Sequence, residues 1–419
     1  MSQRHGHPRL SGARVATVAF VTPVPKRADL TSRSKRLAAA VLLRCLRLYE
    51  GLKARLLVDV PDPGDDAFYN QADNLDACSS GEILDSRAVD IRMLRRRLKV
   101  DAWQVKFRTT TSEGTPASGV ATVMLPRRWA DGTRRPLLAY QPAIDSLGPA
   151  GDPSYTMRHG DQLELPVMLL ALRRGWAVVA VDWTGPQHSF VDLPLAARFV
   201  LDGIRAALVF EPAGLDADTP VGLWGYSGGA LATLFAAEQH PHYAPELNIV
   251  GAAAGGGGVD ITSSPEMFEA GNLLSGIPFG ACIAASRTFP DFDVAGHLTP
   301  HGKAMVAAAE EMTMEQLAMS FPFVRMSSIL TVPTISDVPG TRAGFAATRC
   351  GKATPTTAMF LYHAVHDQAT EIADVDKLVE KYRSEGVDVV YRRFRFGEHM
   401  IVMVRAVPGA LAFLAKRFG

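Results

Sequence analysis

Cysteine is scarce in this sequence. The 419 residues contain only Cys45, Cys78, Cys282 and Cys350, and none of these is spaced as a CxxC pair or as another metal-ligand motif. So few cysteines in a chain of this length cannot form the disulfide framework that stabilises small secreted domains. The sequence therefore excludes a cysteine-rich scaffold, and it leaves open whether any of the four cysteines pair.

An excess of charge of one sign is absent from the chain as a whole. The sequence has 44 Lys and Arg residues against 43 Asp and Glu residues, which gives a net charge of +1. This charge is unevenly distributed, because residues 1–60 carry +9 and the remainder carries −8. A slightly acidic body offers no electrostatic surface for nucleic acid. We therefore expect no nucleic-acid partner, and polyanion binding is compatible only with residues 1–60.

Long apolar runs are absent too. The longest stretches without charge, residues 219–237 and 270–286, are interrupted by Gly and Pro, so neither is predicted to span a membrane. The chain does contain 47% apolar residues at a mean hydropathy of +0.06, a composition typical of a globular protein with a large core. Disorder over most of the length is excluded, and the length permits one large domain with an insertion.

The first 60 residues differ from the rest in pattern as well as in charge. Residues 15–24 form an apolar run of signal-peptide length, but no small-x-small cleavage site follows it, so export is left open. Residues 36–57 show a helical period in which Arg36, Arg44, Arg47 and Arg55 share one face. This basic amphipathic helix has two interpretations, a helix at a lipid interface or a helix packed on the body with its arginines extended into solvent.

Strand-like and helix-like runs alternate beyond a loop rich in Pro, Gly and Asp at residues 62–76. Two antiparallel-looking strands followed by β/α alternation predict an α/β protein with the α/β-hydrolase fold, a mostly parallel central sheet flanked by helices. The predicted strands are residues 103–110, 119–125, 137–141, 176–181, 221–226, 249–254, 358–364 and 387–394. The predicted helices are residues 163–173, 193–210, 229–239, 372–384 and 401–416.

One spacing interrupts this alternation. About 100 residues separate the strand that ends near Ala254 from the strand that begins near Ala358, far more than one crossover needs. We interpret the excess as an inserted, mainly helical cap (lid). The chain then divides into a basic extension at 1–60, a first core part at 61–258, the cap at 259–352 and a second core part at 353–419. Five methionines in the cap suit either an acyl-chain surface or plain core packing: Met305, Met312, Met314, Met319 and Met326.

A nucleophile-elbow pattern lies at the end of the strand-like run 221–226. The motif G-x-S-x-G occupies residues 225–229 and leads into the helix-like run 229–239. Gly225 and Gly229 allow a strained turn that exposes the hydroxyl group of Ser227, and the N–H groups after the serine face an oxyanion. In a chain with 36 glycines the bare motif is weak evidence, and a glycine-rich turn with a capping serine is the alternative. The strand before it and the helix after it favour a nucleophile.

A serine nucleophile needs a base and an acid that orients the base, and in this fold the chain order is Ser, acid, His. Asp367 follows the strand-like run 358–364, and His399 follows the run 387–394, so we expect both at the carboxyl edge of the sheet, with His399 on a loop. Asp376 is a rival acid inside a predicted helix. The rival histidines adjoin the acid or precede it in the chain: His363, His366, His240, His242, His297 and His301.

The ordered motifs of roughly residues 60–419 resemble the secretory lipase family of the lipase A type. The resemblance implies an α/β-hydrolase with a helical cap that cleaves esters of fatty acids, with Ser227, Asp367 and His399 at the triad positions. The family usually begins with a clear signal peptide, and this chain departs from that pattern. The matching segments are Gly81-Glu-Ile-Leu, Ser86-Arg87, Tyr140-Gln-Pro-Ala-Ile-Asp-Ser146, Gly175-Trp, Asp182, Gly185-Pro186, Leu201-Asp-Gly-Ile-Arg-Ala, Gly225-Tyr-Ser-Gly-Gly-Ala230, Tyr243-Ala-Pro-Glu-Leu-Asn-Ile-Val-Gly251, His366-Asp367 and Glu398-His399.

The resemblance also implies an oxyanion hole in which an aspartic acid side chain works with the backbone N–H after the nucleophile. Asp145 and Gly228 match those two positions. An ionised carboxylate would repel an oxyanion, so this role requires a protonated Asp145, which desolvation beside the cap would favour. The alternative is an Asp-Ser turn without a role in catalysis.

We therefore expect a serine carboxylester hydrolase that cleaves fatty-acyl or other lipid-like esters through an acyl-enzyme intermediate. No metal or organic cofactor is implied. The expected partner is a small lipid-like ester, with contact to a lipid–water interface, and the oligomeric state stays open. The alternatives are an acyltransferase or short-chain esterase on the same triad, or a catalytically silent lipid-binding protein.

Overall fold

The structure is a computed structural model that describes residues 51, 55–127, 135–261, 265–269, 271–272 and 274–419. The apolar run at residues 15–24, Cys45 and most of the predicted basic helix at residues 36–57 lie outside the described residues. Cys78, Cys282 and Cys350 are free thiols.

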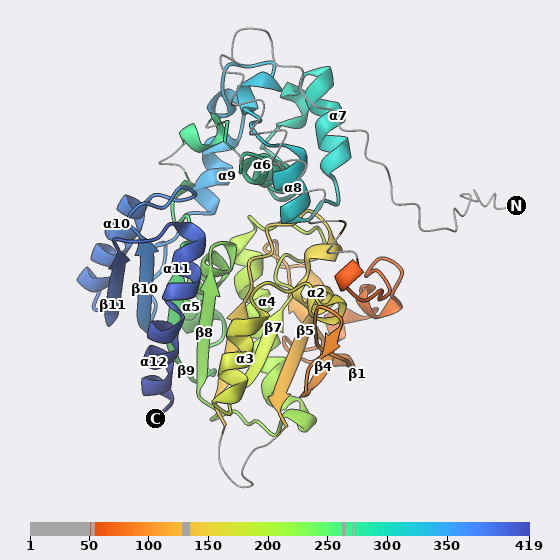
Figure 1. Ribbon diagram of the computed structural model, residues 1–419, viewed down its shortest axis with the longest axis vertical. Coiled ribbons are helices and arrows are strands. Elements are labelled where there is room, and N and C mark those ends of the chain that lie inside the picture. The colour runs from red at the N-terminus through yellow and green to blue at the C-terminus, as the bar shows by residue number, and fades with distance from the viewer. Residues whose placement is uncertain (1–50, 52–54, 128–134, 262–264, 270, 273) are drawn as a thin grey trace, which may run out of the picture.

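A nine-stranded sheet forms the centre of the protein (Figure 1). The strand order is β1, β4, β5, β7, β6, β8, β9, β10, β11. Pairing is antiparallel from β1 to β7 and parallel from β7 to β11. The strands are β1 (Ile83–Ala88), β4 (Val100–Thr110), β5 (Pro116–Pro126), β6 (Leu137–Gln141), β7 (Ala177–Val181), β8 (Val221–Tyr226), β9 (Ile249–Gly255), β10 (Ala358–Ala364) and β11 (Val389–Phe394). A separate hairpin joins β2 (Arg92–Met93) to β3 (Arg96–Arg97).

The central strands are buried along their whole length and are almost wholly apolar, as expected of strands that helices cover on both faces of the sheet. All residues of β6, β7 and β8 are buried. In the parallel register, Gln141 at the end of β6 pairs with Gly225 of β8, and Tyr226 of β8 pairs with Gly255 of β9. The carboxyl ends of these strands therefore lie at one edge of the sheet, and the segments that follow them meet there.

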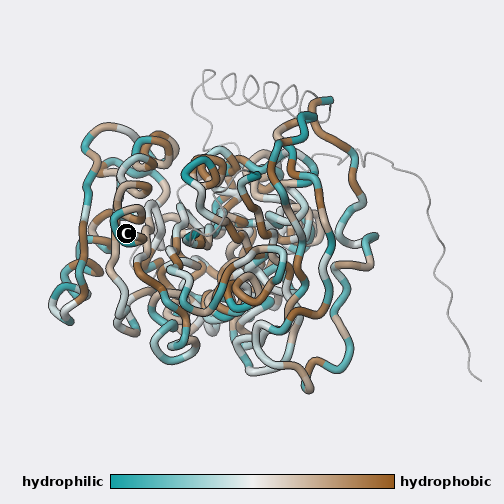
Figure 2. The backbone as a smooth tube through the Cα atoms, turned by 90° about the horizontal axis from the view of Figure 1, so that it is seen from below, coloured by the Kyte–Doolittle hydropathy of each residue, from teal (hydrophilic) through white to brown (hydrophobic). Residues whose placement is uncertain are grey.

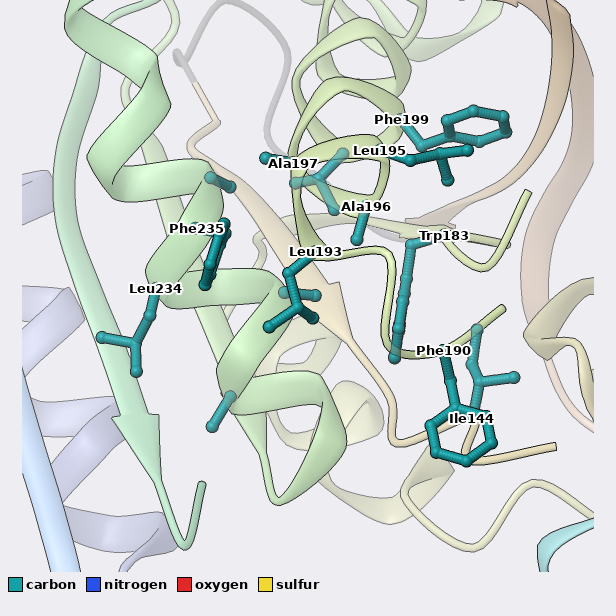
Figure 3. Packing of buried hydrophobic residues seen from close by; sticks show 14 of the residues in the cluster. Ile144, Trp183, Phe190, Leu193, Leu195, Ala196, Ala197, Phe199, Leu234 and Phe235 are labelled. Atoms are coloured by element: carbon teal, nitrogen blue, oxygen red, sulfur yellow. The ribbon is translucent and has the colours of Figure 1, made fainter. Parts of the chain in front are cut away.

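Helices cover both faces of the sheet. The buried apolar side chains form two separate clusters, one on each face. Figure 3 shows part of the larger cluster, in which side chains of α4 and α5 such as Leu193 and Phe235 pack together. Figure 2 shows how apolar and polar segments alternate along the backbone of this layered arrangement. One face carries α4 (Leu193–Val209), α5 (Gly228–Tyr243) and α10 (Ile372–Ser384), and the other carries α2 (Pro153–His159), α3 (Leu165–Arg173), α11 (His399–Arg405) and α12 (Val407–Phe418).

The C-terminal helix differs from the prediction. The sequence predicts one helix at residues 401–416, whereas α11 and α12 are two helices bent by 42°. Pro408 lies in the first turn of α12, a position where a helix tolerates the missing backbone N–H. In the interior of one continuous helix the same proline would interrupt the hydrogen bonding. Within the described residues no single helix is long and apolar enough to cross a membrane, and this bent pair passes the same test only when its two helices are combined.

The described residues within 259–352, between β9 and β10, form a mainly helical layer over the carboxyl edge of the sheet (Figure 1). Its helices are α6 (Gly276–Thr288), α7 (Pro300–Ala309), α8 (Met314–Ser320) and α9 (Thr341–Ala347). The rings of Phe279 and Phe321 pack edge to face, with centroids 4.8 Å apart. The layer contacts the core at the loop after β6, where the N–H of Met314 donates to Oγ of Ser146 over 3.1 Å and Arg287 donates to the carbonyl of Leu147 over 2.7 Å.

Candidate active site

Ser227 occupies a strained turn between β8 and α5. Its φ of 54° and ψ of −123° are unfavourable for a residue with a side chain, and its N–H is held by the carbonyl of Gly255 at 2.9 Å. The turn also requires two glycines. A Cβ at position 225 would lie 2.2 Å from the carbonyl oxygen of Gly229, and a Cβ at position 229 would lie 1.9 Å from that of Gln141. The strand and helix around the motif thus form the turn that the sequence predicts.

His399 links Ser227 to Asp367. Nε2 of His399 lies 2.9 Å from Oγ of Ser227, and Nδ1 lies 2.9 Å and 3.1 Å from the two carboxylate oxygens of Asp367. The Asp367 side chain is 0% exposed and that of His399 is 9% exposed. The structure therefore brings together the three residues that the sequence singles out.

The position of His399 differs from the expected loop, because His399 is the first residue of α11. Glu398 caps this helix by accepting hydrogen bonds from the N–H groups of Met400 and Ile401, both at 3.0 Å. The hydroxyl group of Tyr226 donates to the carbonyl of His399 over 2.6 Å. These contacts fix the backbone that carries the imidazole.

Asp367 is held in its ionised form by several donors. Its Oδ1 accepts hydrogen bonds from the N–H groups of Ala369 and Thr370, at 2.9 Å and 3.1 Å. Burial opposes ionisation, but the hydrogen bond and charge of His399, with the Ala369 N–H, outweigh it and lower the pKa of Asp367. His363 lies on the other side of Asp367, with Nε2 at 3.7 Å from Oδ2 and at 3.1 Å from the hydroxyl of Thr370.

Most of the residues that compete in the sequence for the acid and base positions make contacts away from Ser227. Asp376 is in α10, where it pairs with Arg393 at 3.5 Å and accepts a hydrogen bond from Tyr391. His240 bonds to the carbonyl of Leu247, His297 contacts the carbonyl of Asp293, and His366 is exposed. Of the rival histidines with described contacts, His363 is the one that touches Asp367.

Asp145 lies beside Gly228, the first residue of α5. A Cβ at position 228 would lie 2.3 Å from Oδ1 of Asp145, so the carboxyl group is packed against the turn that follows the serine. Burial raises the pKa of Asp145 to about 6, although the charge of His399 acts in the opposite direction. The backbone of Asp145 has a φ of 20°, an uncommon value for a residue with a side chain.

Glu164, which the sequence analysis did not single out, supports the loop that carries Asp145. Its carboxyl oxygens accept hydrogen bonds from the hydroxyl of Tyr140 at 2.6 Å and from the N–H of Ala143 at 2.8 Å. Burial raises the pKa of Glu164 to about 7, despite these two donors, and the nearby Asp145 adds to the effect. An acid before Leu-Pro at the start of a predicted helix looks like an ordinary surface residue, so no sequence signal pointed to this contact.

A cavity of about 660 Å³ lies between the core and the layer formed by residues 259–352. Ser227, His399, Asp145 and Gly228 line it, together with apolar side chains from both parts of the chain. Of the five methionines that the sequence singles out between residues 305 and 326, Met314 lines the cavity, whereas Met305, Met312 and Met326 are buried in the larger apolar cluster and Met319 is not part of the lining. Three methionines that the sequence analysis did not consider also line it: Met267, Met400 and Met403.

In the part of the chain that the structure describes, no group of three or more His, Cys, Asp or Glu side chains is arranged to hold a metal ion. The polar groups that line the cavity include the hydroxyl of Ser227, the imidazole of His399 and the carboxyl groups of Asp145 and Asp367, which are groups that acyl transfer uses.

The protein has the α/β-hydrolase fold, which confirms the fold class predicted from the sequence. The chain is similar to the crystal structure of Candida antarctica lipase A in its closed state, with a TM-score of 0.78 and 26% sequence identity over 86% of this chain and 87% of that chain. Residues 153–419 match the secretory lipase family, and the chain belongs to that family, as its motifs indicated.

Two sequence relatives cover most of the chain. A probable inactive lipase of Mycobacterium tuberculosis is 35% identical over 85% of this chain and 82% of its own length. Lipase A of Arthroderma benhamiae is 31% identical over 86% of this chain and 81% of its own length. The family supports hydrolysis of lipid esters by an enzyme of the lipase type. Since one relative is named as inactive, the activity of this chain has to be argued from its own residues.

Proposed function

We propose that this protein is a serine carboxylester hydrolase that cleaves fatty-acyl or other lipid-like esters through an acyl-enzyme intermediate. The observation that carries the proposal is the position of His399, with Nε2 at 2.9 Å from Oγ of Ser227 and Nδ1 at 2.9 Å from Oδ2 of Asp367. This is the arrangement in which an imidazole can take a proton from a serine hydroxyl while a carboxylate holds the correct tautomer.

In the first half of the proposed reaction, Oγ of Ser227 attacks the ester carbonyl carbon while Nε2 of His399 takes the hydroxyl proton. The ionised Asp367 stabilises the imidazolium that forms, which agrees with the lowered pKa of this buried carboxyl. The tetrahedral intermediate then collapses, the C–O bond to the alcohol breaks, and His399 donates its proton to the departing alkoxide.

In the second half, water attacks the acyl group on Ser227. His399 takes a proton from this water and returns it to Oγ of Ser227 as the fatty acid leaves, so each residue ends in its starting state. An alcohol that replaces water in this step would make the protein an acyltransferase on the same residues.

We assign the oxyanion hole to the N–H of Gly228 and the protonated carboxyl of Asp145. Contact between the two groups supports this assignment, because the Asp145 carboxyl lies within van der Waals distance of Gly228 at the start of α5. A buried carboxyl with a pKa of about 6 is kept neutral at lower pH and can then donate a hydrogen bond to an oxyanion.

We also propose the four-part division of the chain, in which residues 259–352 act as the cap over the site and residues 1–60 precede a core made of 61–258 and 353–419. Contacts of Met314 and Arg287 with the loop at residues 146–147 support a cap that closes on Asp145. The apolar lining that Met267, Met314 and Met403 contribute suits an acyl chain.

Labelling with an alkyl fluorophosphonate tests the proposal, because phosphonylation requires an activated serine and releases fluoride. We expect one adduct by intact-mass spectrometry, mapped to Ser227, none in Ser227→Ala, and an unchanged adduct in Ser146→Ala, a second serine that lines the cavity. No adduct on the wild-type protein would favour a catalytically silent lipid-binding protein.

The substrate class requires a second measurement. We expect kcat/KM for p-nitrophenyl esters to rise from acetate towards long acyl chains, since a cavity of about 660 Å³ has room for more than a short acyl group. A maximum at acetate would favour a short-chain esterase, and faster transfer to an added alcohol than to water would favour an acyltransferase.

A further inference from the structure

Four large apolar side chains are exposed next to His399. Among the described residues, Phe396 is the most exposed large apolar side chain at 78%, and Val404, Ile401 and Met400 are 65%, 49% and 48% exposed. These four residues lie within nine positions of the sequence, on α11 and on the turn before it. We refer to them as the α11 patch.

The α11 patch faces outward because of the helical geometry of α11. Met400 and Val404 are one helical turn apart and Ile401 is next to them, whereas His399 and Val402 point inward and are buried. Figure 1 shows α11 beside β10, near the end of the sheet that faces the layer formed by residues 259–352. The same short helix thus presents an imidazole to the interior and an apolar surface to the outside.

The α11 patch is continuous with the substrate cavity. Met400 belongs to both, since it is half exposed and also lines the cavity, and Met403 lines the cavity one turn after His399. An apolar molecule bound to the patch would therefore lie next to the cavity.

Two arginines, Arg392 and Arg405, lie beside this apolar surface. Residues 389–419 contain six Lys and Arg residues and one acid, Glu398. Residues 61–388, by contrast, contain more acids than bases, 39 against 26. The guanidinium groups of Arg392 and Arg405 both lie over the ring of Phe394, at 5.0 Å and 5.7 Å from its centroid, and Arg405 donates a hydrogen bond to the carbonyl of Phe396. A cationic segment on an otherwise acidic body selects for a negatively charged partner.

We infer that the α11 patch, with Arg392 and Arg405, docks this protein on an anionic phospholipid surface beside the mouth of the cavity. The inference rests on the proposed function for its purpose, since docking would bring lipid esters to Ser227. Two observations together identify a phospholipid surface as the partner of the α11 patch. Exposed apolar side chains bordered by arginines match the acyl and phosphate layers of a membrane surface, and continuity with the cavity gives a lipid a direct path inward.

The test is sedimentation of the full chain with vesicles, in a Ser227→Ala background so that lipid is not consumed. Vesicles of phosphatidylcholine alone are compared with vesicles that also contain phosphatidylglycerol. We expect binding to the anionic vesicles that weakens as salt is added. Equal binding to both vesicle types, or binding to neither, would overturn the inference.

Two multiple variants and a matched pair of single variants separate the contributions. Replacement of Phe396, Ile401 and Val404 by Ser should weaken vesicle binding on the order of tenfold or more, because affinity scales with buried apolar area. Replacement of Arg392 and Arg405 by Gln should weaken it by about 25-fold, since each basic residue near an anionic surface contributes about fivefold. The matched control is Val209→Ser, which removes a side chain of 67% exposure from the end of α4, compared with Val404→Ser.

The controls distinguish the failure of this inference from the failure of the proposed function. Circular dichroism and thermal unfolding establish that each variant is folded. Vesicle binding without phosphonate labelling would remove the catalytic proposal and leave docking intact, whereas labelling without vesicle binding would overturn docking alone. Light scattering tests whether a second copy of the chain binds the α11 patch instead of a membrane. If the parent protein is an oligomer that the triple Ser substitution dissociates, and if the parent protein binds no vesicles, the patch is an interface between copies and the inference is wrong.

Discussion

The carboxyl group of Asp145 and the Cα of Gly228 are in such close contact that a Cβ at position 228 would lie 2.3 Å from Oδ1 of Asp145. Gly228 has no positive φ that would itself require glycine, so the contact with Asp145 is what excludes a larger residue there. The loop after β6 and the turn after β8 are therefore fitted to each other at the point where we place the oxyanion.

The first prediction follows from this contact. Gly228→Ala keeps the backbone N–H but displaces the Asp145 carboxyl, so kcat should fall on the order of 10²–10³, the cost of losing one oxyanion donor. The check is a double-mutant cycle with Asp145→Ala. The double variant should be little worse than Asp145→Ala alone, because both changes remove the same donor. Wild-type activity in Gly228→Ala would show that Asp145 has no part in catalysis.

The pH dependence of kcat should reveal the protonation state of Asp145. Burial raises its pKa to about 6, so the carboxyl is neutral below that pH and charged above it. If the neutral form donates to the oxyanion, kcat falls as Asp145 ionises with rising pH. In the substrate complex this fall should occur at about pH 6 or above, because a substrate that fills the cavity removes further water and raises the pKa of Asp145. Asp145→Asn keeps an N–H donor without the ionisable group, so it should lack this alkaline limb. An identical limb in both proteins would assign it to another group.

The same carboxyl should affect stability. Its pKa is raised from 3.8 in the unfolded chain to about 6, so the folded state binds more protons between these values and loses stability as pH rises from about 4 to 6. Asp145→Asn removes this loss and should increase the free energy of unfolding at pH 8 by at most about 3 kcal/mol. Urea unfolding at pH 4 and pH 8 measures the difference, and a variant destabilised at pH 8 would contradict the prediction.

The cap offers a matched pair of methionines on α8. Met314 lines the cavity and Met319 does not, although both are half-buried. Met314→Glu should therefore reduce kcat/KM for long-chain esters by at least about tenfold and affect acetate esters little, because a charge opposes the apolar chain. Met319→Glu should change both substrates equally. Equal effects of the two substitutions on long-chain esters would place the acyl chain elsewhere.

Much of the core could be predicted from the sequence because burial on both faces makes the central strands continuous apolar runs. Residues 137–141, 221–226, 358–364 and 372–384 form the predicted strands and helix with the same bounds. Ser227, Asp367 and His399 could be selected because each follows a strand, and the carboxyl ends of parallel strands meet at one edge. The geometry brings these three together, and their roles stay predictions.

What could not be predicted depends on contacts between segments far apart in sequence. The break at Ala406 was missed because the run through Pro408 keeps a helical pattern on both sides. The five methionines between residues 305 and 326 share one composition signal, yet of these five only Met314 lines the cavity, since facing the site depends on how α8 packs on the loop at Ser146. Glu164 is the clearest case, because its partner Ala143 lies 21 residues earlier.

Glu164 should act as a positioning residue for Asp145. Glu164→Ala leaves the Ala143 N–H and the Tyr140 hydroxyl without their acceptor, so the loop that carries Asp145 loosens and kcat should fall on the order of 10-fold to 100-fold while KM changes little. Glu164→Gln should retain most of the activity, because its amide oxygen accepts from Ala143 and its amide N–H can donate to Tyr140. Tyr140→Phe, which removes one of the two hydrogen bonds, should have an intermediate effect. If Glu164→Ala lowers the melting temperature but leaves kcat unchanged, the contact stabilises the fold without positioning Asp145.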